Sequence, residues 1–367
     1  MAEVTLNNIT KEFDGGVVAV KDLSLSITDG EFLVLLGPSG CGKTTTLRMI
    51  AGLDTQTRGD IFIGERRVNE LRAGDRDIAF VFQFYALYPH LTVWDNISFP
   101  LRAQNLPQNE VAKRVNEVAT RLRISHLLKK RPGRLPGGEQ QRVALGRAMV
   151  RQPQVFLMDE PLTNLDASLR ADMRTELKHL QQELATTMVY VTHDQIEAMS
   201  MSHRIAVLNL GVLQQVDTPL NIYRYPQTLF VATFIGSPPM NIIECSLQGD
   251  KLNGVNGHFD YTLTPESGFD TSESNSGYFG IRAEDIMLSA GDSEGDLRGE
   301  ISIREPLGDE TIYRVDIGAY QMTVKTSPKF VLSAGDRVSL TFNRKRIHLF
   351  DKITEQSLRT QEAVARV

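Results

Sequence analysis

A glycine-rich run between an apolar segment and a helical pattern constrains this chain more than any other feature. The apolar segment, residues 31–36, is typical of a buried strand, and residues 45–51 predict a helix that ends near Gly52. A strand, a loop and a helix in this order are the context that a phosphate-binding loop, or P-loop, requires. The run has the pattern G-x-x-x-x-G-K-[ST] and comprises Gly37, Pro38, Ser39, Gly40, Cys41, Gly42, Lys43, Thr44 and Thr45.

The chemistry of this run predicts a nucleotide site. Gly37, Gly40 and Gly42 allow positive φ angles, so successive N–H groups can turn inward and form an anion site at the positive end of the helix dipole. Lys43 then reaches the β- and γ-phosphates of ATP, and the Thr44 hydroxyl holds Mg²⁺. A glycine-rich turn that binds nothing is the alternative, but the pattern arises by accident in roughly one chain in a hundred of this length.

Length and charge limit the classes of protein to which the chain can belong. With 367 residues it is long enough for two or three domains, each with its own core. A net charge of −5 gives no overall attraction to nucleic acid or anionic lipid. No apolar run approaches the roughly 20 residues that span a bilayer, and the first residues predict a strand, so we expect a cytosolic protein. Cys41 and Cys245 lie far apart, which favours reduced thiols with a packing role over a disulfide or zinc site.

Two further apolar strands end in polar residues that suit the same site. Residues 153–160 end in Asp159 and Glu160, and in an open α/β sheet ligands bind at the carboxyl ends of strands. Asp159 is suited to hold Mg²⁺ through water, and Glu160 to orient and deprotonate the attacking water. The strand 188–192 ends in His193, the third strand end to deliver a polar group to one crevice. The start of a turn at the acids and a structural histidine are the alternatives.

Residues 3–36 alternate short β-branched runs with turns, which predicts a small antiparallel sheet beside the P-loop strand. Phe13 precedes one glycine-rich turn. Its ring either stacks on a purine or packs in the core of the domain. From the sequence alone we expect Phe13 to be a core residue.

The segment 84–150 predicts a mostly helical insertion. A strand over residues 77–82 runs into Gln83, and apolar residues farther along repeat at helical spacing. The first part of the insertion is crowded with large side chains, which predicts either a partner-binding groove or half-buried packing. These side chains belong to Tyr85, Leu87, Tyr88, Pro89, His90 and Trp94.

The texture of the sequence changes at about residue 236. Short β-rich runs separated by turn residues follow, which predicts one or two small β-barrels. The stretch 264–277 is rich in Ser and Gly and predicts a mobile loop. We therefore place a domain boundary between 1–235 and 236–367.

Taken together, these motifs resemble the ATPase subunit of an ATP-binding-cassette (ABC) importer, close to the maltose and multiple-sugar group. The stretches similar to the superfamily are the P-loop, Phe80–Gln83 (the Q-loop), Leu135–Gln141 (the signature), Phe156–Pro161 (Walker B), Asn164–Asp166 (the D-loop) and His193 (the switch histidine). Those similar to the sugar group are Tyr85–His90, Phe234–Asn241 and Gly280–Glu284.

The resemblance implies a fold and a role for several residues. The fold is an α/β P-loop NTPase domain with a helical subdomain, followed by an all-β domain of oligonucleotide/oligosaccharide-binding (OB) type barrels used for dimer contact and regulation. Phe13 would stack on adenine, and Gln83 would touch Mg²⁺ and the lytic water. His193 would contact the γ-phosphate, and Asp166 belongs to the D-loop.

The resemblance also implies partners. Two membrane permease subunits would dock a coupling helix in the aromatic groove, an extracytoplasmic solute-binding protein would deliver the solute, and the chain would lie at the cytoplasmic face of the membrane. The cargo expected is a carbohydrate or polyol-like solute, with glycerol phosphate, ferric ion, sulfate or polyamine as alternatives. A soluble ABC ATPase acting on nucleic acid, or a regulatory scaffold with a vestigial ATPase, are alternatives from other classes, and we expect no nucleic-acid partner.

The signature departs from the family pattern Leu-Ser-Gly-Gly-Gln. Phosphoryl transfer needs more positive potential at the γ-phosphate than one chain supplies, so a second subunit is expected to bring a helix N-terminus, here that of a helix over 139–151. Pro136 replaces the serine of the pattern and offers neither a hydroxyl nor an N–H to the γ-phosphate. Glu139 replaces the glutamine and adds a negative charge. Turnover at this pocket should be slow, whether the assembly is a homodimer or, as we slightly favour, a heterodimer with a paralogue. The residues concerned are Leu135, Pro136, Gly137, Gly138 and Glu139.

Overall fold

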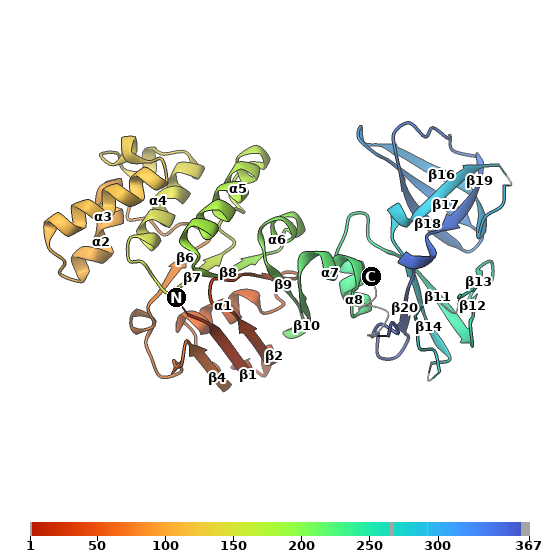
Figure 1. Ribbon diagram of the computed structural model, residues 1–367, viewed down its shortest axis with the longest axis horizontal. Coiled ribbons are helices and arrows are strands. Elements are labelled where there is room, and N and C mark those ends of the chain that lie inside the picture. Colours follow the sequence, from red (N-terminus) through yellow and green to blue (C-terminus); the bar gives the residue numbers. More distant parts are fainter. Residues whose placement is uncertain (1, 265–267, 273, 292, 361–367) are drawn as a thin grey trace. The chain divides into compact units, whose positions relative to one another are not determined.

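The computed structural model describes residues 2–264, 268–272, 274–291 and 293–360. The chain forms two compact units, Met1–Pro219 and Leu220–Val367 (Figure 1). The boundary predicted from sequence composition, between 235 and 236, stays a prediction. Within the described ranges, no helix combines the length and the apolar composition needed to cross a bilayer.

A six-stranded sheet forms the centre of the first unit. Its strands β9, β3, β8, β7 and β6 are parallel, and β10 pairs antiparallel with β9 at one edge. Every residue of β3 and β8 is buried, because helices and a second sheet cover the parallel strands. The order is β10 (Val212–Asp217), β9 (Arg204–Asn209), β3 (Phe32–Leu36), β8 (Thr187–Thr192), β7 (Val155–Asp159) and β6 (Ile78–Val81).

A second, antiparallel sheet packs against the same core, as the sequence predicted. Its order is β2 (Val17–Ile27), β1 (Val4–Phe13), β4 (Arg58–Ile63) and β5 (Arg66–Arg67). Apolar residues of β1 and β2 join those of β3 and β7 in one buried cluster. This shared core fixes the β1–β2 hairpin beside the loop that follows β3.

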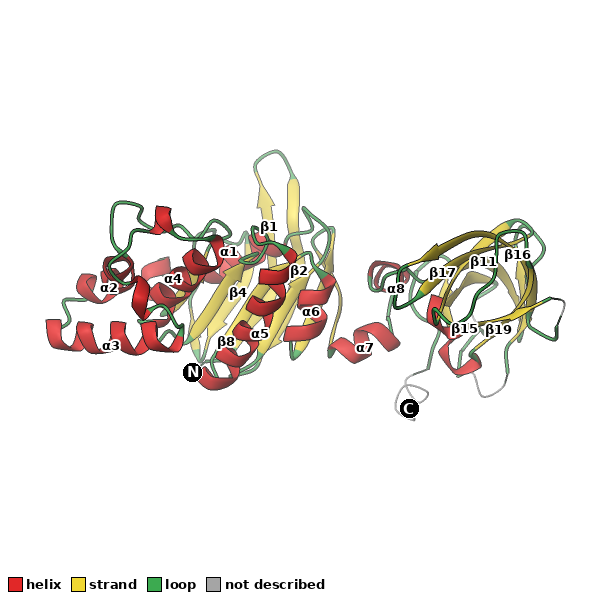
Figure 2. Cartoon of the chain, turned by 90° about the horizontal axis from the view of Figure 1, so that it is seen from above, coloured by secondary structure: helices red, strands yellow, loops and turns green. Residues whose placement is uncertain are grey.

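Three helices pack on the central sheet (Figure 2). The first begins in the glycine-rich run and ends at Gly52, whose left-handed backbone caps it, as predicted. The N-caps of the other two helices are Asp166, the last residue of the D-loop, and Asp194, which follows the switch histidine. The helices are α1 (Lys43–Ala51), α5 (Ala167–Leu184) and α6 (Gln195–Met201), and a 3₁₀ turn covers Ala73–Asp75.

The insertion after β6 is helical, as predicted. Val111, Val115 and Val118 lie on the buried face of its middle helix. The last helix spans Gly137–Met149 rather than 139–151, so the prediction was wrong by two residues at each end. Glycine is unfavourable mainly in the interior of a helix, so two glycines in the first turn are tolerated. The helices are α2 (Val93–Ala103), α3 (Gln108–Arg121) and α4 (Gly137–Met149), with 3₁₀ turns at Ser125–Leu127 and Pro132–Arg134.

The second unit has two antiparallel five-stranded sheets around one apolar core, consistent with the predicted OB-type barrels. The first sheet is β13 (Asp260–Thr262), β12 (Lys251–Gly254), β11 (Asn241–Gln248), β14 (Ser276–Ile281) and β20 (His348–Asp351). The second is β15 (Ile286–Ala290), β19 (Arg337–Phe342), β16 (Leu297–Pro306), β17 (Thr311–Ile317) and β18 (Tyr320–Thr326). Helices α7 (Pro219–Arg224) and α8 (Leu229–Phe234) precede them, with 3₁₀ turns at Ala283–Asp285 and Arg344–Arg346.

Two of the stretches that resemble sugar importers meet in this unit. The buried Arg282 guanidinium donates to the Ile235 and Tyr223 carbonyls, at 2.7 Å each, and lies over the Tyr223 ring. Arg282 therefore fastens α7 and α8 to the first sheet. The loop predicted at 264–277 lies partly outside the described residues, and its last two residues begin β14.

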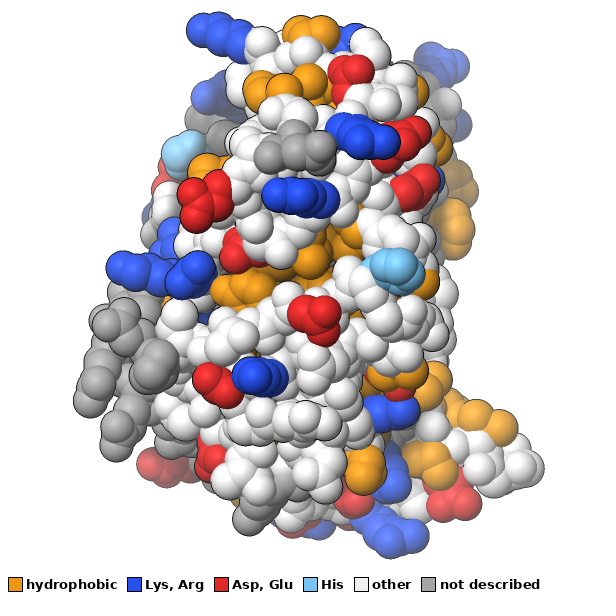
Figure 3. Space-filling view, turned by 90° about the vertical axis from the view of Figure 1, so that its right-hand side faces the viewer, with side chains coloured by type: hydrophobic (Ala, Val, Ile, Leu, Met, Phe, Trp, Pro, Cys, Tyr) orange, Lys and Arg blue, Asp and Glu red, His pale blue; other side chains and the backbone are white. Residues whose placement is uncertain are grey.

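The face of the second unit seen in Figure 3 carries Lys and Arg side chains interspersed with Asp and Glu, around an apolar strip in a hollow. A surface that grips a nucleic-acid backbone would instead gather cations.

Both cysteines of the chain are buried and free. Burial raises the pKa of Cys245 to about 11, which fits the predicted packing role.

Candidate active site

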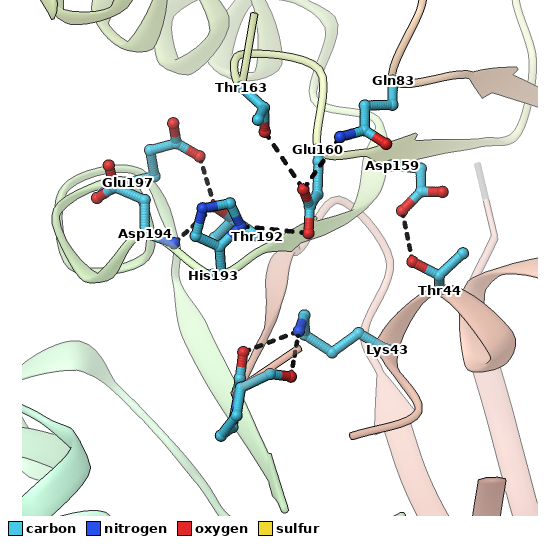
Figure 4. Close-up of polar contacts among 12 residues, drawn as sticks. Lys43, Thr44, Gln83, Asp159, Glu160, Thr163, Thr192, His193, Asp194 and Glu197 are labelled. Atoms are coloured by element: carbon cyan, nitrogen blue, oxygen red, sulfur yellow. Dashed lines mark hydrogen bonds and ion pairs between the residues drawn. The ribbon is translucent and has the colours of Figure 1, made fainter. Parts of the chain in front are cut away.

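Four parallel strands deliver their carboxyl ends to one edge of the central sheet, and the predicted polar residues follow them (Figure 4). The P-loop follows β3, Gln83 follows β6, Glu160 follows β7, and His193 follows β8. The residues brought together come from positions more than a hundred apart in the chain. Parallel pairing of buried strands explains this convergence.

The P-loop has the backbone that an anion cradle needs. Gly40 and Gly42 have φ angles of +80° and +100°, and a Cβ at Gly42 would lie 2.3 Å from the Ala19 carbonyl oxygen. Lys43 is 5% exposed, and its ammonium donates to the Gly37 and Pro38 carbonyls, at 2.8 Å each. The loop thus holds its cation in place before any phosphate is bound.

Thr44 and Asp159 form an oxygen pair beside the loop. The Thr44 hydroxyl donates to an Asp159 carboxylate oxygen at 2.9 Å. Burial raises the pKa of Asp159, and the nearby Glu160 charge adds to the rise, although the Thr44 hydrogen bond opposes it. A hydroxyl and a carboxylate are hard ligands that suit Mg²⁺. Among the described residues there is no group of three His, Cys, Asp or Glu side chains that could hold a metal ion by itself.

Side chains from three other positions contact the carboxylate of Glu160. Its carboxylate lies 3.3 Å from His193 Nδ1, and it accepts from Gln83 Nε2 at 3.4 Å and from Thr163 Oγ1 at 3.3 Å. Its φ of 44° is left-handed, a strained conformation for a residue with a Cβ, and its N–H donates to the Val191 carbonyl at 3.0 Å. The strain turns the carboxylate out of the strand and into the crevice. Thr163 was not predicted, because only the turn after Walker B brings it back to Glu160.

A buried carboxylate braces the strand that carries His193. Glu197 is 3% exposed and accepts from the Tyr190 hydroxyl at 2.8 Å and from the Thr192 hydroxyl at 2.7 Å. Burial raises the pKa of Glu197, and these two hydrogen bonds oppose the rise. Two hydrogen bonds therefore tie the end of β8 to α6, while the His193 side chain itself is about half exposed.

Phe13 lies on the surface, so the expectation that it packs in the core was wrong. Its side chain, at the end of β1, is 42% exposed, and the Lys11 ammonium lies 4.9 Å from the ring centroid. Val17 and Val18, across the same hairpin, are also exposed. Phe13 and Val17 are direct partners across the hairpin, so their exposed side chains lie next to each other on one of its faces.

The signature lies apart from these contacts. Pro136 is the N-cap of α4 and makes no side-chain cap, and Glu139 lies in the first turn. Within the described chain, no polar contact joins residues 135–139 to Lys43 or Glu160. The two glycines have a steric reason, because a Cβ at Gly138 would lie 2.9 Å from the Leu169 side chain.

A groove of about 530 Å³ runs between the sheet edge and the helical insertion. Of the six large side chains singled out from the sequence, Tyr88 is the one found among the described residues that line the groove, and Tyr85 is buried. Phe82 and Phe99, not singled out from the sequence, are exposed there, and the Tyr88 and Phe99 ring centroids lie 4.8 Å apart. Arg147 donates to the Tyr85 and Ala86 carbonyls and shapes one wall.

Comparisons with known proteins identify this arrangement. Residues 20–163 match the ABC transporter family, and residues 279–350 match the TOBE domain. The chain is 50% identical to the xylose/arabinose import ATP-binding protein of Haloferax volcanii, over 99% of this chain and 97% of the relative. The chain belongs to the ATP-binding subunits of ABC importers.

Other relatives of this ABC subunit carry similar names. The trehalose/maltose import ATP-binding protein of Thermococcus litoralis is 48% identical, over 98% of this chain and 100% of the relative. The sn-glycerol-3-phosphate import ATP-binding protein of Rhodopseudomonas palustris is 44% identical, over 95% and 97%. The resemblance to sugar-type importers predicted from sequence is confirmed.

Solved structures agree with this family. The ATP-binding cassette MJ0796, solved as a dimer in a post-hydrolysis state bound to ADP and phosphate, is 34% identical, with a TM-score of 0.54 over 59% of this chain and 98% of that chain. CbiO1 from Clostridium perfringens is 27% identical, with a TM-score of 0.57 over 60% and 89%. The ABC subunit is therefore an ATPase with the fold predicted.

Proposed function

We propose that this ABC subunit hydrolyses Mg-ATP at Glu160 to drive import of a carbohydrate or polyol-like solute. The observation that carries the proposal is the convergence of Gln83, Thr163 and His193 on one carboxylate next to a P-loop. The cargo follows from the relatives, whose names specify xylose/arabinose, trehalose/maltose and glycerol 3-phosphate.

Binding uses the P-loop amides and one lysine. The ammonium of Lys43 would exchange the Gly37 and Pro38 carbonyls for the β- and γ-phosphates, whose negative charge attracts it more strongly. The exposed ring of Phe13 would stack on adenine. Thr44, Asp159 and Gln83 would hold Mg²⁺, which supplies positive charge against the phosphates.

Hydrolysis uses the carboxylate of Glu160 as base. It would accept a proton from the attacking water while the water oxygen bonds to the γ-phosphorus and the bond to the bridging oxygen of ADP breaks. The His193 imidazole, 3.3 Å from Glu160, is placed to contact the γ-phosphate, and Gln83 to orient the water.

A second subunit would complete the pocket. Among the described residues, 135–139 make no polar contact with Lys43 or Glu160, which fits a signature that acts in trans, with Asp166 of the D-loop at the same interface. Because Pro136 cannot donate and Glu139 is negative, pockets closed by this signature should turn over slowly. We favour a heterodimer, in which a paralogue supplies an unaltered signature to this chain's P-loop, over a homodimer.

The groove beside the insertion would receive a permease. Phe82, Tyr88 and Phe99 provide apolar surface close to Gln83. A permease helix bound on this surface would therefore be able to shift the Q-loop. Two permease subunits and an extracytoplasmic solute-binding protein would then place the ATPase at the cytoplasmic face of the membrane, as a peripheral subunit.

Phosphate release and solute uptake test this proposal together. We expect the subunit, reconstituted with its permeases in vesicles, to release phosphate from Mg-ATP only in step with uptake of a sugar or polyol, and to lose both with EDTA. Phosphate release without uptake of any carbohydrate, polyol or glycerol phosphate would exclude the proposed cargo.

A further inference from the structure

Arg170 links two loops of the candidate site that come from different strands. It lies in the first turn of α5, where Nη2 donates to the Leu165 carbonyl at 3.1 Å and Nη1 lies 3.4 Å from Asp194 Oδ2. Leu165 belongs to the loop after Walker B, and Asp194 directly follows His193. One planar guanidinium therefore spans the D-loop and the switch-histidine loop.

Both ends of this bridge are firmly attached. Asp194 is the N-cap of α6, and its Oδ1 accepts from the backbone N–H groups of Ile196 at 2.8 Å and Glu197 at 3.1 Å. At the other end, Asp166 caps α5 by accepting from the Leu169 N–H at 3.0 Å. A shift of either helix start is thus carried to the other through the guanidinium.

The bridged D-loop also touches the rest of the site. Thr163 contacts Glu160, and Asn164 Nδ2 donates to the Gln83 carbonyl at 3.0 Å. The contact between Glu160 and His193 is itself made across two strand ends, with the imidazole about half exposed. Nothing in that contact alone fixes the imidazole, so its place depends on the loop that carries it.

We infer that Arg170 is a positioning residue for ATP hydrolysis, which holds His193 in register with Glu160 by bridging the Leu165 carbonyl and the Asp194 carboxylate. The inference rests on the proposed roles of Glu160 and His193. Arg170 touches neither nucleotide nor the reacting atoms. A partly exposed ion pair contributes little to stability, so loss of this pair should leave the unfolding temperature almost unchanged.

The test compares kcat, KM for ATP and the unfolding temperature in the reconstituted complex. Arg170→Gln should lower kcat by about tenfold to a hundredfold, since a small misplacement of a catalytic group costs that much, and leave KM within about twofold. Arg170→Lys keeps the charge but cannot serve both acceptors in a fork, so its kcat should lie in between. Arg174→Gln, one turn along α5, is the matched control and should behave as wild type.

A double variant shows whether the effect passes through Asp194. Asp194→Asn keeps an oxygen that can cap α6 but loses the charge facing Arg170. If the two residues act as one link, Arg170→Gln with Asp194→Asn should be no slower than the slower single variant. If the losses of kcat in the two single variants add fully in the double variant, Arg170 does not act through Asp194 and the inference is wrong.

Glu160→Gln separates this inference from the function on which it rests. If Glu160→Gln abolishes turnover while Arg170→Gln keeps a wild-type kcat, Arg170 has no positioning role and the proposed site stands. If Glu160→Gln hydrolyses ATP normally, the proposed site itself fails. A fall in the unfolding temperature of Arg170→Gln that matches its loss of activity would mean that the residue is only structural.

Discussion

At the scale of single residues, the site depends on side chains whose environments differ from those that the sequence suggested. Phe13 is the clearest case, since its exposure on the β1–β2 hairpin leaves one aromatic face free. Glu160 is another, because its left-handed backbone directs the carboxylate away from the strand. Each difference leads to a measurable consequence.

Phe13→Ala should weaken ATP and ADP binding equally. Stacking of a base on an aromatic ring contributes about 1–3 kcal/mol, and ATP and ADP carry the same base. Calorimetric titration of both nucleotides measures this loss, and Phe13→Trp should keep most of the affinity. Unchanged affinity in Phe13→Ala would mean that adenine binds elsewhere.

His348 should give the second unit a pH-dependent stability. Burial and the positive charges of Arg359, Arg282 and Arg346 lower its pKa to about 3. Below its ordinary pKa of about 6.5 the unfolded chain binds a proton that the folded chain does not, so stability falls as the pH falls toward 3, by at most about 1.4 kcal/mol per pH unit.

Urea unfolding of wild type and His348→Gln at several pH values measures this contribution. Above pH 7 the difference in stability between the two proteins should be constant. Between pH 6 and 4 the wild type should lose stability faster than the variant. Parallel profiles across that range would show that His348 does not carry the proton linkage.

At the scale of elements, the sequence predicted the strands, loops and helices that have a periodic or spaced residue pattern. It did not predict the contacts that form only when distant elements pack together. The P-loop, the strand ends and the helical insertion follow from apolar periodicity and glycine spacing. Phe82 directly follows β6 and Phe99 lies in α2, so the two residues share one groove only after folding. Arg170 becomes a bridge only because α5 starts beside the switch loop. The start of α4 at Gly137 was missed because glycine normally disfavours a helix.

Close packing of α4 on α5 should make Gly138 sensitive to substitution. Gly138→Ala places a methyl 2.9 Å from Leu169, and overpacking of this kind costs about 1–3 kcal/mol. Thermal unfolding measures the cost, and Leu169→Ala in the same chain should recover part of it. Gly133→Ala, with open space around it, is the control. Equal stability of both alanine variants would argue against steric exclusion at Gly138.

At the scale of the whole molecule, the altered signature distinguishes the two assemblies. Each pocket of a homodimer would be closed by the α4 start that Pro136 caps. Pro136→Ser with Glu139→Gln should raise ATPase activity of the isolated chain, by up to on the order of a hundredfold, because one donor to a developing charge is worth about 3 kcal/mol. Robust activity of the unmodified chain by itself would count against the heterodimer.

The most direct test of the central claim is the comparison of Mg-ATP binding and phosphate release in wild type and Glu160→Gln, both in the complex with the permeases. Loss of the base should reduce turnover by on the order of 10²–10⁴ while ATP affinity stays within a few-fold of wild type. Lys43→Ala, by contrast, should weaken binding itself. Wild-type turnover in Glu160→Gln, or failure of the wild type to retain Mg-ATP, would contradict the account.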